Sequence, residues 1–299
     1  MKILFFLAII ISFSGCGGGG GNGNIVTTPV NNVADVVSTP EDNVADVVTT
    51  PENAVSNAPN FNIVTHSDIN FTATNRKVMV FGIPIYAFAE VEDGKLLHAA
   101  NIMAQYIDND EDGNVDNQTL LDALITNNAS LFMWKTEDQS NLRATPNAQD
   151  LGADETIPDW HSNGHTGEFD AALEEVWHVI TNSGYKNAYP SIFGLDTNTS
   201  LTNAMDVARG GQFTTIPTTY PNDAWYTYDD TTCFYSCMAT EYIYWAMTSI
   251  LGAQENRLED EWDLNTSTLV QATDATIYNL LTDTQYKFPT VLPDGTYNQ

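Results

Sequence analysis

The sequence predicts an α+β fold, in which mixed helices pack around a small sheet. Residues 168–184 (EFDAALEEVWHVITNSG) place apolar side chains at steps of three and four, which is the pattern of an amphipathic helix. Residues 235–251 are almost entirely apolar and predict a second, buried helix. Residues 78–91 and 130–135 are rich in β-branched and aromatic side chains and predict strands.

Between these segments, further elements follow in order. Residues 78–91 predict a strand, or a pair broken at Gly82 and Pro84. Residues 93–107 and 119–125 carry helical apolar stripes on either side of an acidic loop. The helix 168–184 is expected to end at Gly184, where glycine allows the left-handed turn. The remaining expectations are a polar segment from 136 to 167, an aromatic loop over 185–232, an exposed acidic stretch over 254–262 and a short helix over 275–281.

Composition limits the functions open to this chain. It has 299 residues, 42% of them hydrophobic, which is enough for one or two domains with a sizeable core. Its 39 acidic residues against 10 Lys and Arg give a formal charge of −29. This charge argues against nucleic acid as a partner and against electrostatic docking on anionic lipid. It suits bound cations and a surface exposed to salty water.

The N-terminus predicts export and lipid anchoring. Lys2 precedes a short apolar run over 3–13, as in a signal peptide, and Ser-Gly-Cys follows. This ending resembles the lipobox of bacterial lipoproteins, which implies a signal peptide over 1–15 and lipidation of Cys16. Gly17 follows the cysteine, which by the bacterial sorting pattern implies an outer-membrane lipoprotein on the periplasmic or cell-surface side. The alternative is an ordinary signal peptide and a secreted product.

Residues 16–60 predict a disordered tether. They contain a Gly/Asn tract and the repeat VADVVSTPE and VADVVTTPE, which has proline and too few large apolar residues for a core. The globular part is expected over 61–299 as a single α+β domain. Within it, 93–126 forms the unit around the acidic loop, and 130–285 the part with a candidate metal site.

The cysteines fit this arrangement. If Cys16 carries lipid, Cys233 and Cys237 remain as a pair. They lie four apart, where a disulfide forms most easily at the start of a helix. Two buried free thiols are the alternative.

The acidic loop over 108–116 (DNDEDGNVD) predicts a calcium site. Carboxylates occupy its positions one, three, five and nine, with glycine at the sharp turn and a backbone carbonyl available at position seven. Ca²⁺ prefers six to eight oxygen ligands, and this spacing wraps them around one ion. The loop resembles an EF-hand but has Thr119 at position twelve, where an EF-hand has glutamate. The alternative is a solvated turn without an ion. The predicted ligands are Asp108, Asp110, Asp112, Asn114 and Asp116.

The helix 168–184 carries a candidate transition-metal site. Glu174 and His178 are four apart and share a helix face, with Glu175 between them. A third ligand is needed, and Glu241 is the one charged residue of the apolar stretch 238–251. A buried carboxylate needs a cation, so Glu241 predicts either a metal ligand or an ion pair with Arg209.

These residues resemble the gluzincin type of zinc metallopeptidase. There, an H-E-x-x-H helix supplies two ligands and the general base, and a glutamate on a later helix completes the site. The ending around Asp274 and Tyr278 is similar to that of lethal-factor-like secreted zincins. The resemblance implies Zn²⁺ on Glu174, His178 and Glu241, with Glu175 deprotonating a water during hydrolysis of a peptide or protein. One of three tyrosines would stabilise the oxyanion: Tyr226, Tyr228 or Tyr242.

Several alternatives remain open. The same fold could serve a non-catalytic binding or structural lipoprotein with a degenerate site, since Glu174 stands where this peptidase type has histidine. A loop histidine, His165, is a candidate replacement ligand, although a surface role is expected for it and for His161. His98 is expected to be a hydrogen-bonded core histidine. A di-metal site is disfavoured because the second helix lacks Glu-x-x-His, and a serine hydrolase because G-x-S-x-G is absent from the sequence.

Overall fold

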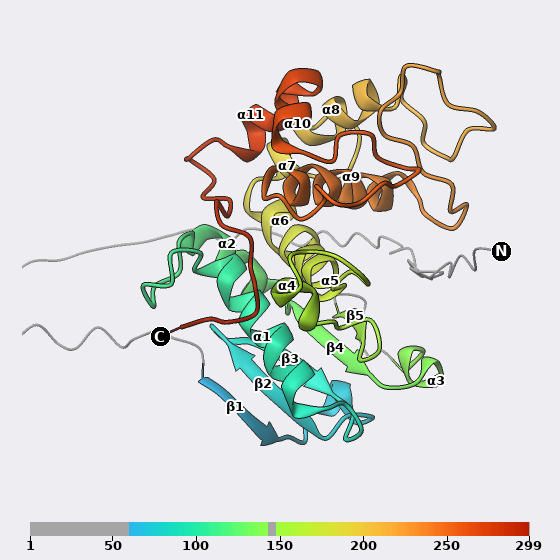
Figure 1. Cartoon of the computed structure of the whole chain (residues 1–299). Coiled ribbons are helices and arrows are strands. Elements are labelled where there is room, and N and C mark those ends of the chain that lie inside the picture. Colours follow the sequence, from blue (N-terminus) through green and yellow to red (C-terminus); the bar gives the residue numbers. More distant parts are fainter. Residues whose placement is uncertain (1–59, 143–147, 299) are drawn as a thin grey trace, which may run out of the picture. The chain divides into compact units, whose positions relative to one another are not determined.

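The computed structural model describes residues 60–142 and 148–298, which belong to one compact unit. They form a mixed α+β fold with a five-stranded sheet, as predicted (Figure 1). The signal peptide, Cys16 and the tether lie outside the described residues. Within the described ranges, no helix is both long and apolar enough to cross a bilayer.

The sheet has the strand order β1-β2-β3-β4-β5. The first three strands pair antiparallel, and β3, β4 and β5 pair parallel. β4 reads SLFMW and is buried along its whole length, as expected for a strand in the middle of a covered sheet. The strands are β1 (Asn60–Thr65), β2 (Arg76–Val80), β3 (Ile83–Ala87), β4 (Ser130–Trp134) and β5 (Ala148–Gly152).

The predicted break in 78–91 is a tight hairpin between β2 and β3. Phe81 and Gly82 both have positive φ angles, of 47° and 88°, as a two-residue turn between twisted strands requires. The chain then crosses from β3 to the parallel strand β4 through two helices, α1 (Asp93–Ile107) and α2 (Gln118–Thr126), with the acidic loop between them. β5 was not predicted, because its sequence AQDLG has no run of β-branched or aromatic residues.

The amphipathic helix differs from its predicted bounds. α5 covers Ala172–Val179 and continues as a π-helix, η2 (Ile180–Tyr185), into α6 (Lys186–Ala188). The prediction that Gly184 ends this helix is therefore wrong. Gly184 serves close packing instead, since a Cβ there would lie 2.4 Å from Cδ1 of Leu120 on α2.

This packing gives a stability prediction. Gly184→Ala is expected to destabilise the fold by about 1–3 kcal/mol, because Leu120 is buried and cannot move aside freely. Gly94→Ala is the matched control, since Gly94 lies in α1 with no atom within 4 Å of an added Cβ, and a change within about 1 kcal/mol is expected. Denaturant unfolding measures both, and equal stability of the two variants would contradict this account of Gly184.

The helix α9 (Tyr235–Ile250) matches the predicted buried helix, and it packs on α5. α5 also contacts α1, β4 and β5, so it joins the sheet to the helices drawn in yellow to red (Figure 1). The predicted loop over 185–232 is wrong in part, since it contains α6, α7 and α8. The remaining helical segments are η1 (Ile69–Phe71), α3 (Glu137–Ser140), α4 (Asp159–Ser162), α7 (Pro190–Phe193), α8 (Ser200–Ala208), α10 (Ser267–Thr273) and α11 (Ala275–Leu281).

Candidate metal centre

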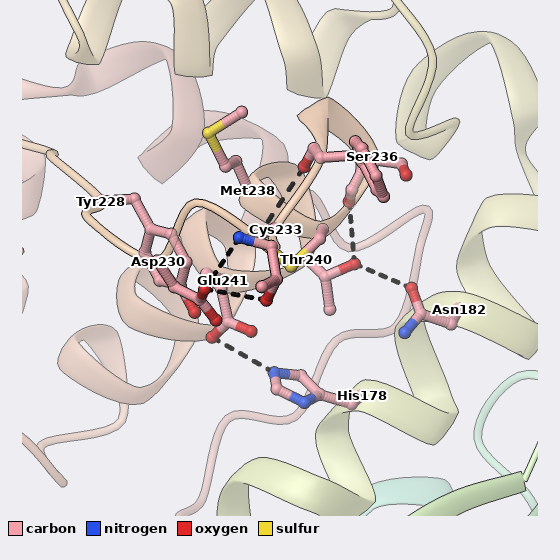
Figure 2. The surroundings of a disulfide bond; sticks show 12 residues. His178, Asn182, Tyr228, Asp230, Cys233, Ser236, Met238, Thr240 and Glu241 are labelled. Atoms are coloured by element: carbon pink, nitrogen blue, oxygen red, sulfur yellow. Dashed lines mark hydrogen bonds and ion pairs between the residues drawn. A yellow bond between two sulfur atoms is a disulfide. The ribbon is translucent and has the colours of Figure 1, made fainter. Parts of the chain in front are cut away.

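α5 and α9 bring Glu174, His178 and Glu241 together. One ligand-type atom from each lies within 4.8 Å of the others. Nε2 of His178 is 3.5 Å from a carboxylate oxygen of Glu241, and Figure 2 shows the ring of His178 directed toward that carboxylate. His178 and Glu241 are only 2% and 3% exposed, whereas Glu174 is partly buried. Two carboxylates and one imidazole at this separation form a donor set that Zn²⁺ accepts.

His178 is oriented from the side opposite Glu241. Its Nδ1 lies 3.5 Å from Oε2 of Glu175, and the same oxygen accepts a 2.5 Å hydrogen bond from Nε2 of Gln149 on β5. Nε2 of His178 is buried and has no hydrogen-bond partner among the described residues. A metal-binding histidine typically has a carboxylate on the ring nitrogen that does not bind the metal, as Glu175 is placed here.

The electrostatics of the site favour a cation. Burial, and then the charge of Glu241, raise the pKa of Glu174 to about 8. Burial also raises the pKa of Glu175. Burial lowers the pKa of His178, but the neighbouring Glu241 and Glu175 carboxylates raise it well above its usual value. Without an ion these groups hold extra protons, which a divalent cation can replace.

The alternative partner for Glu241, Arg209, lies elsewhere. Its guanidinium donates a 2.7 Å hydrogen bond to the carbonyl oxygen of Phe213 and lies over the Phe213 ring. No ion pair joins Arg209 to Glu241 among the described residues, so the predicted Arg209 pair is not formed. The basic group beside Glu241 is the imidazole of His178.

The three candidate tyrosines differ in their contacts. Tyr226 donates to the carbonyl oxygen of Met238 at 2.7 Å, and Tyr242 donates to Asp274 at 2.6 Å, so both hydroxyls are engaged in the core. Tyr228 lies near the site, where burial and then the charge of Glu241 raise its pKa (Figure 2). Tyr228 is therefore the best placed of the three for a role at the metal centre.

Two neighbours of the site were not predicted from the sequence. Tyr244 packs its ring 5.8 Å from that of His178, and burial and then the charge of Glu174 raise its pKa. Gln149 contacts Glu175 from β5. The i, i+3 spacing of Tyr244 from Glu241 on α9 places the two on one helix face and was the available signal for Tyr244. Gln149 had no such signal, because β5 itself was not recognised.

A disulfide joins Cys233 and Cys237 at the start of α9. The bond closes the first turn of the helix that carries Glu241, one turn before that residue (Figure 2). Nearby, Thr240 donates a 2.8 Å hydrogen bond to the side chain of Asn182 in η2. The disulfide holds the start of α9, and the Thr240–Asn182 hydrogen bond connects α9 to the helical segment that follows His178.

The acidic loop brings together three of its five predicted ligands, Asp108, Asp110 and Asp112. Asp116 is not part of this group, and its carboxylate accepts a 2.7 Å hydrogen bond from the backbone N–H of Asn109. Asn114 donates its side-chain amide to Asp112, which leaves its backbone carbonyl as the expected position-seven ligand. Burial raises the pKa of Asp108.

The other histidines do not join the Glu174 group. His165 stacks on Trp160, with ring centroids 4.4 Å apart. His98 is buried and hydrogen-bonded to Asp170, as expected for a core histidine. His161 was expected at the surface, but its side chain is only 7% exposed and contacts the same aspartate.

No family model, curated protein or solved structure matches this chain. The resemblances to gluzincins, EF-hands and bacterial lipoproteins therefore stay predictions.

Proposed function

We propose that this chain is a lipid-anchored, extracytoplasmic hydrolase in which Glu174, His178 and Glu241 bind Zn²⁺. The observation that carries the proposal is the state of His178. Its Nε2 is buried, lies 3.5 Å from Glu241 and has no hydrogen-bond partner among the described residues, while Glu175 contacts the opposite ring nitrogen. A buried polar atom without a hydrogen-bond partner destabilises the fold, unless a group such as a metal ion occupies the position that the atom faces.

The ligand count supports a catalytic ion. Three protein ligands leave a fourth position for water or substrate, as in catalytic zinc sites, whereas structural sites use four protein ligands. When bound, the ion supplies Lewis-acid polarisation of a water and of the scissile carbonyl. By the motif, Glu175 would accept the proton of that water. In this conformation the carboxylate of Glu175 contacts Nδ1 of His178. Tyr228 would donate to the carbonyl oxygen as negative charge develops there.

The sheet edge beside the site supports a peptide substrate. β5 is the last strand in the sheet order, so one side of its backbone has no neighbouring strand in the described part of the chain. An extended peptide can add to such an edge through main-chain hydrogen bonds. β5 packs on α5, and its Gln149 contacts Glu175, so a peptide on this edge would run close to the metal ligands.

A hydrolysis assay tests this function. Protein loaded with Zn²⁺ should cleave an unstructured protein such as casein, and a chelator should stop the cleavage. Glu241→Gln should lower the rate at a given Zn²⁺ concentration by at least about 100-fold through loss of one ligand. Asp263→Asn, at an exposed carboxylate outside the site, is the control and should retain full activity. Cleavage that survives both the chelator and Glu241→Gln would exclude the site as its source.

The second candidate is a non-catalytic metal-stabilised lipoprotein with the same fold. Two observations favour it: the ligands are largely buried, and two of the three are anionic, which weakens the Lewis acidity of an ion. This protein would bind Zn²⁺ with the same residues but cleave no peptide.

We also propose that the acidic loop binds Ca²⁺ and fixes α1 to α2. Asp110→Ala is the informative variant, because Asp110 is exposed, whereas Asp108 also accepts hydrogen bonds from Gly113 and Tyr297 that stabilise the ion-free loop. With Ca²⁺ at 100 times Kd, the free energy of unfolding of wild type should rise by about 2.7 kcal/mol, and that of the variant by much less. Asp122→Ala, on α2, is the control. An equal loss of melting temperature in Asp110→Ala with Ca²⁺ and with chelator would contradict the calcium site.

A further inference from the structure

A second group of metal-type donors lies just before α5. Nε2 of His98 is 2.7 Å, and Nε2 of His161 2.9 Å, from the same oxygen of Asp170, Oδ2. The three residues come from α1, from α4 and from the turn that precedes α5. Their side chains are 6%, 7% and 0% exposed, respectively. We propose that His98, His161 and Asp170 form a second binding site for a divalent transition-metal ion.

Asp170 is held in place as a ligand would be. Its other oxygen, Oδ1, accepts hydrogen bonds from the backbone N–H groups of Ile157 at 2.8 Å and Ala172 at 3.4 Å. These bonds aim Oδ2 at the two imidazoles. Burial alone would raise the pKa of Asp170, but hydrogen bonds from His161 and His98 hold it well below its usual range.

Asp170 has no lysine or arginine partner in the part of the chain that the structure describes. Among the residues that the structure describes, the ion-pair partners recorded for Asp170 are His98 and His161. Nδ1 of His161 is buried without a hydrogen-bond partner in the same set. A buried carboxylate is normally paired with a cation or coordinates a metal, and Asp170 with its two imidazoles would coordinate an ion at this point.

The ring of His98 has little room to move. The C-terminal segment packs Gly295 directly on its ring, where a Cβ would lie 2.1 Å from Cε1 and Nδ1 of His98. Gly295 also accepts a hydrogen bond from Asn101, one helical turn further along α1, at 2.7 Å. An ion with bonds of about 2.0–2.2 Å would separate Nε2 from Oδ2 to about 3.3 Å, so the donors need to open by only roughly half an ångström.

The donor set indicates the class of ion. Two imidazoles and one carboxylate suit Zn²⁺, Co²⁺ or Ni²⁺, whereas Ca²⁺ and Mg²⁺ prefer oxygen ligands. The site shares no residue with the group of Glu174, His178 and Glu241. It therefore does not depend on the proposed hydrolase function.

Cobalt binding by the full-length protein tests this site. Co²⁺ is titrated in the presence of excess Ca²⁺, and bound metal is counted by equilibrium dialysis. His161→Gln keeps an N–H donor for Asp170 but removes the imidazole, so a hydrogen-bond network would survive and a metal site would not. Wild type should bind two ions, His161→Gln and His178→Gln one each, and the double variant none. Circular dichroism checks folding, and His98→Gln should repeat the loss seen for His161→Gln.

The numbers of bound ions distinguish this site from the one formed by Glu174, His178 and Glu241. If His161→Gln and His98→Gln both bind as much Co²⁺ as wild type, the three residues form only a hydrogen-bond network and the proposal is wrong. A third result is that wild type and His178→Gln each bind one ion and His161→Gln binds none. This result would support the second site and exclude metal binding by Glu174, His178 and Glu241.

Discussion

Replacing His178 with glutamine is expected to remove the ion from the α5–α9 site and to abolish hydrolysis. The imidazole is the one neutral ligand of the three, and Glu175 orients it toward Glu241. Without it, two carboxylates remain, and Zn²⁺ affinity should fall by more than about 100-fold, beyond the loss caused by removing a supporting residue. With Zn²⁺ at 100 times Kd, the variant should lose about 2.7 kcal/mol of ion-dependent stabilisation.

The measurement is isothermal titration with Zn²⁺, together with melting curves with and without the ion. His66→Gln is the matched control, since it removes a histidine that follows β1, the strand at the opposite edge of the sheet from β5. The recorded contacts of His66 are with Thr74, Asp68 and Tyr86. His66→Gln should retain the full ion-dependent rise in melting temperature. An equal rise in His178→Gln would contradict the assignment of His178 as a ligand.

Replacing Glu175 with alanine is expected to lower Zn²⁺ affinity about 100-fold, and Glu175→Gln about 10-fold. The reason is the contact of its carboxylate with Nδ1 of His178, which fixes the ring and makes Nε2 a better ligand. Gln149→Leu should act in the same direction but more weakly, because Gln149 reaches the histidine only through Glu175. Titration of each variant with Zn²⁺ gives the affinities directly.

If Glu175 acts instead as the general base, as the motif implies, the expected result for Glu175→Gln is not a fall in Zn²⁺ affinity. A base can be removed without loss of the ion, so Glu175→Gln would then bind Zn²⁺ as wild type does while cleavage falls by about 10²–10⁴-fold. Glu155→Gln is the control, because Glu155 is a neighbouring carboxylate whose pKa burial raises to about 8, and its recorded partner is the backbone of Gly152. Unchanged affinity in Glu175→Ala would exclude the orienting role.

Local patterns in the sequence predicted the elements with strong periodicity. α1 and α9 were expected at nearly their observed bounds, because each has a long apolar stripe and a clear start. α8 was missed although its buried apolar residues recur at helical steps of three and four, namely Leu201, Ala204, Met205 and Ala208. β5 was missed because its short segment is stabilised by tertiary contacts and has no run of β-branched or aromatic residues. Gly184 was misread for a related reason: its role depends on Leu120, a neighbour that only the fold brings close.

The candidate metal centre was predictable in its ligands but not in its surroundings. Glu174 and His178 share a helix face by spacing, and Glu241 stood out as a lone charge in an apolar helix. That these residues converge was a prediction that the geometry supports. The relay from Gln149 through Glu175 to His178 depends on how β5 packs against α5, which no local pattern records. The same holds for Asp170, His98 and His161, which come from three separate elements.

The central claim is that Glu174, His178 and Glu241 bind one metal ion. The most direct test is X-ray diffraction from crystals grown with Zn²⁺, with data collected on both sides of the zinc absorption edge. An anomalous peak is expected within about 2.0–2.2 Å of Nε2 of His178 and of an oxygen from each glutamate. The absence of a peak there, with Nε2 of His178 hydrogen-bonded directly to Glu241, would contradict the central claim.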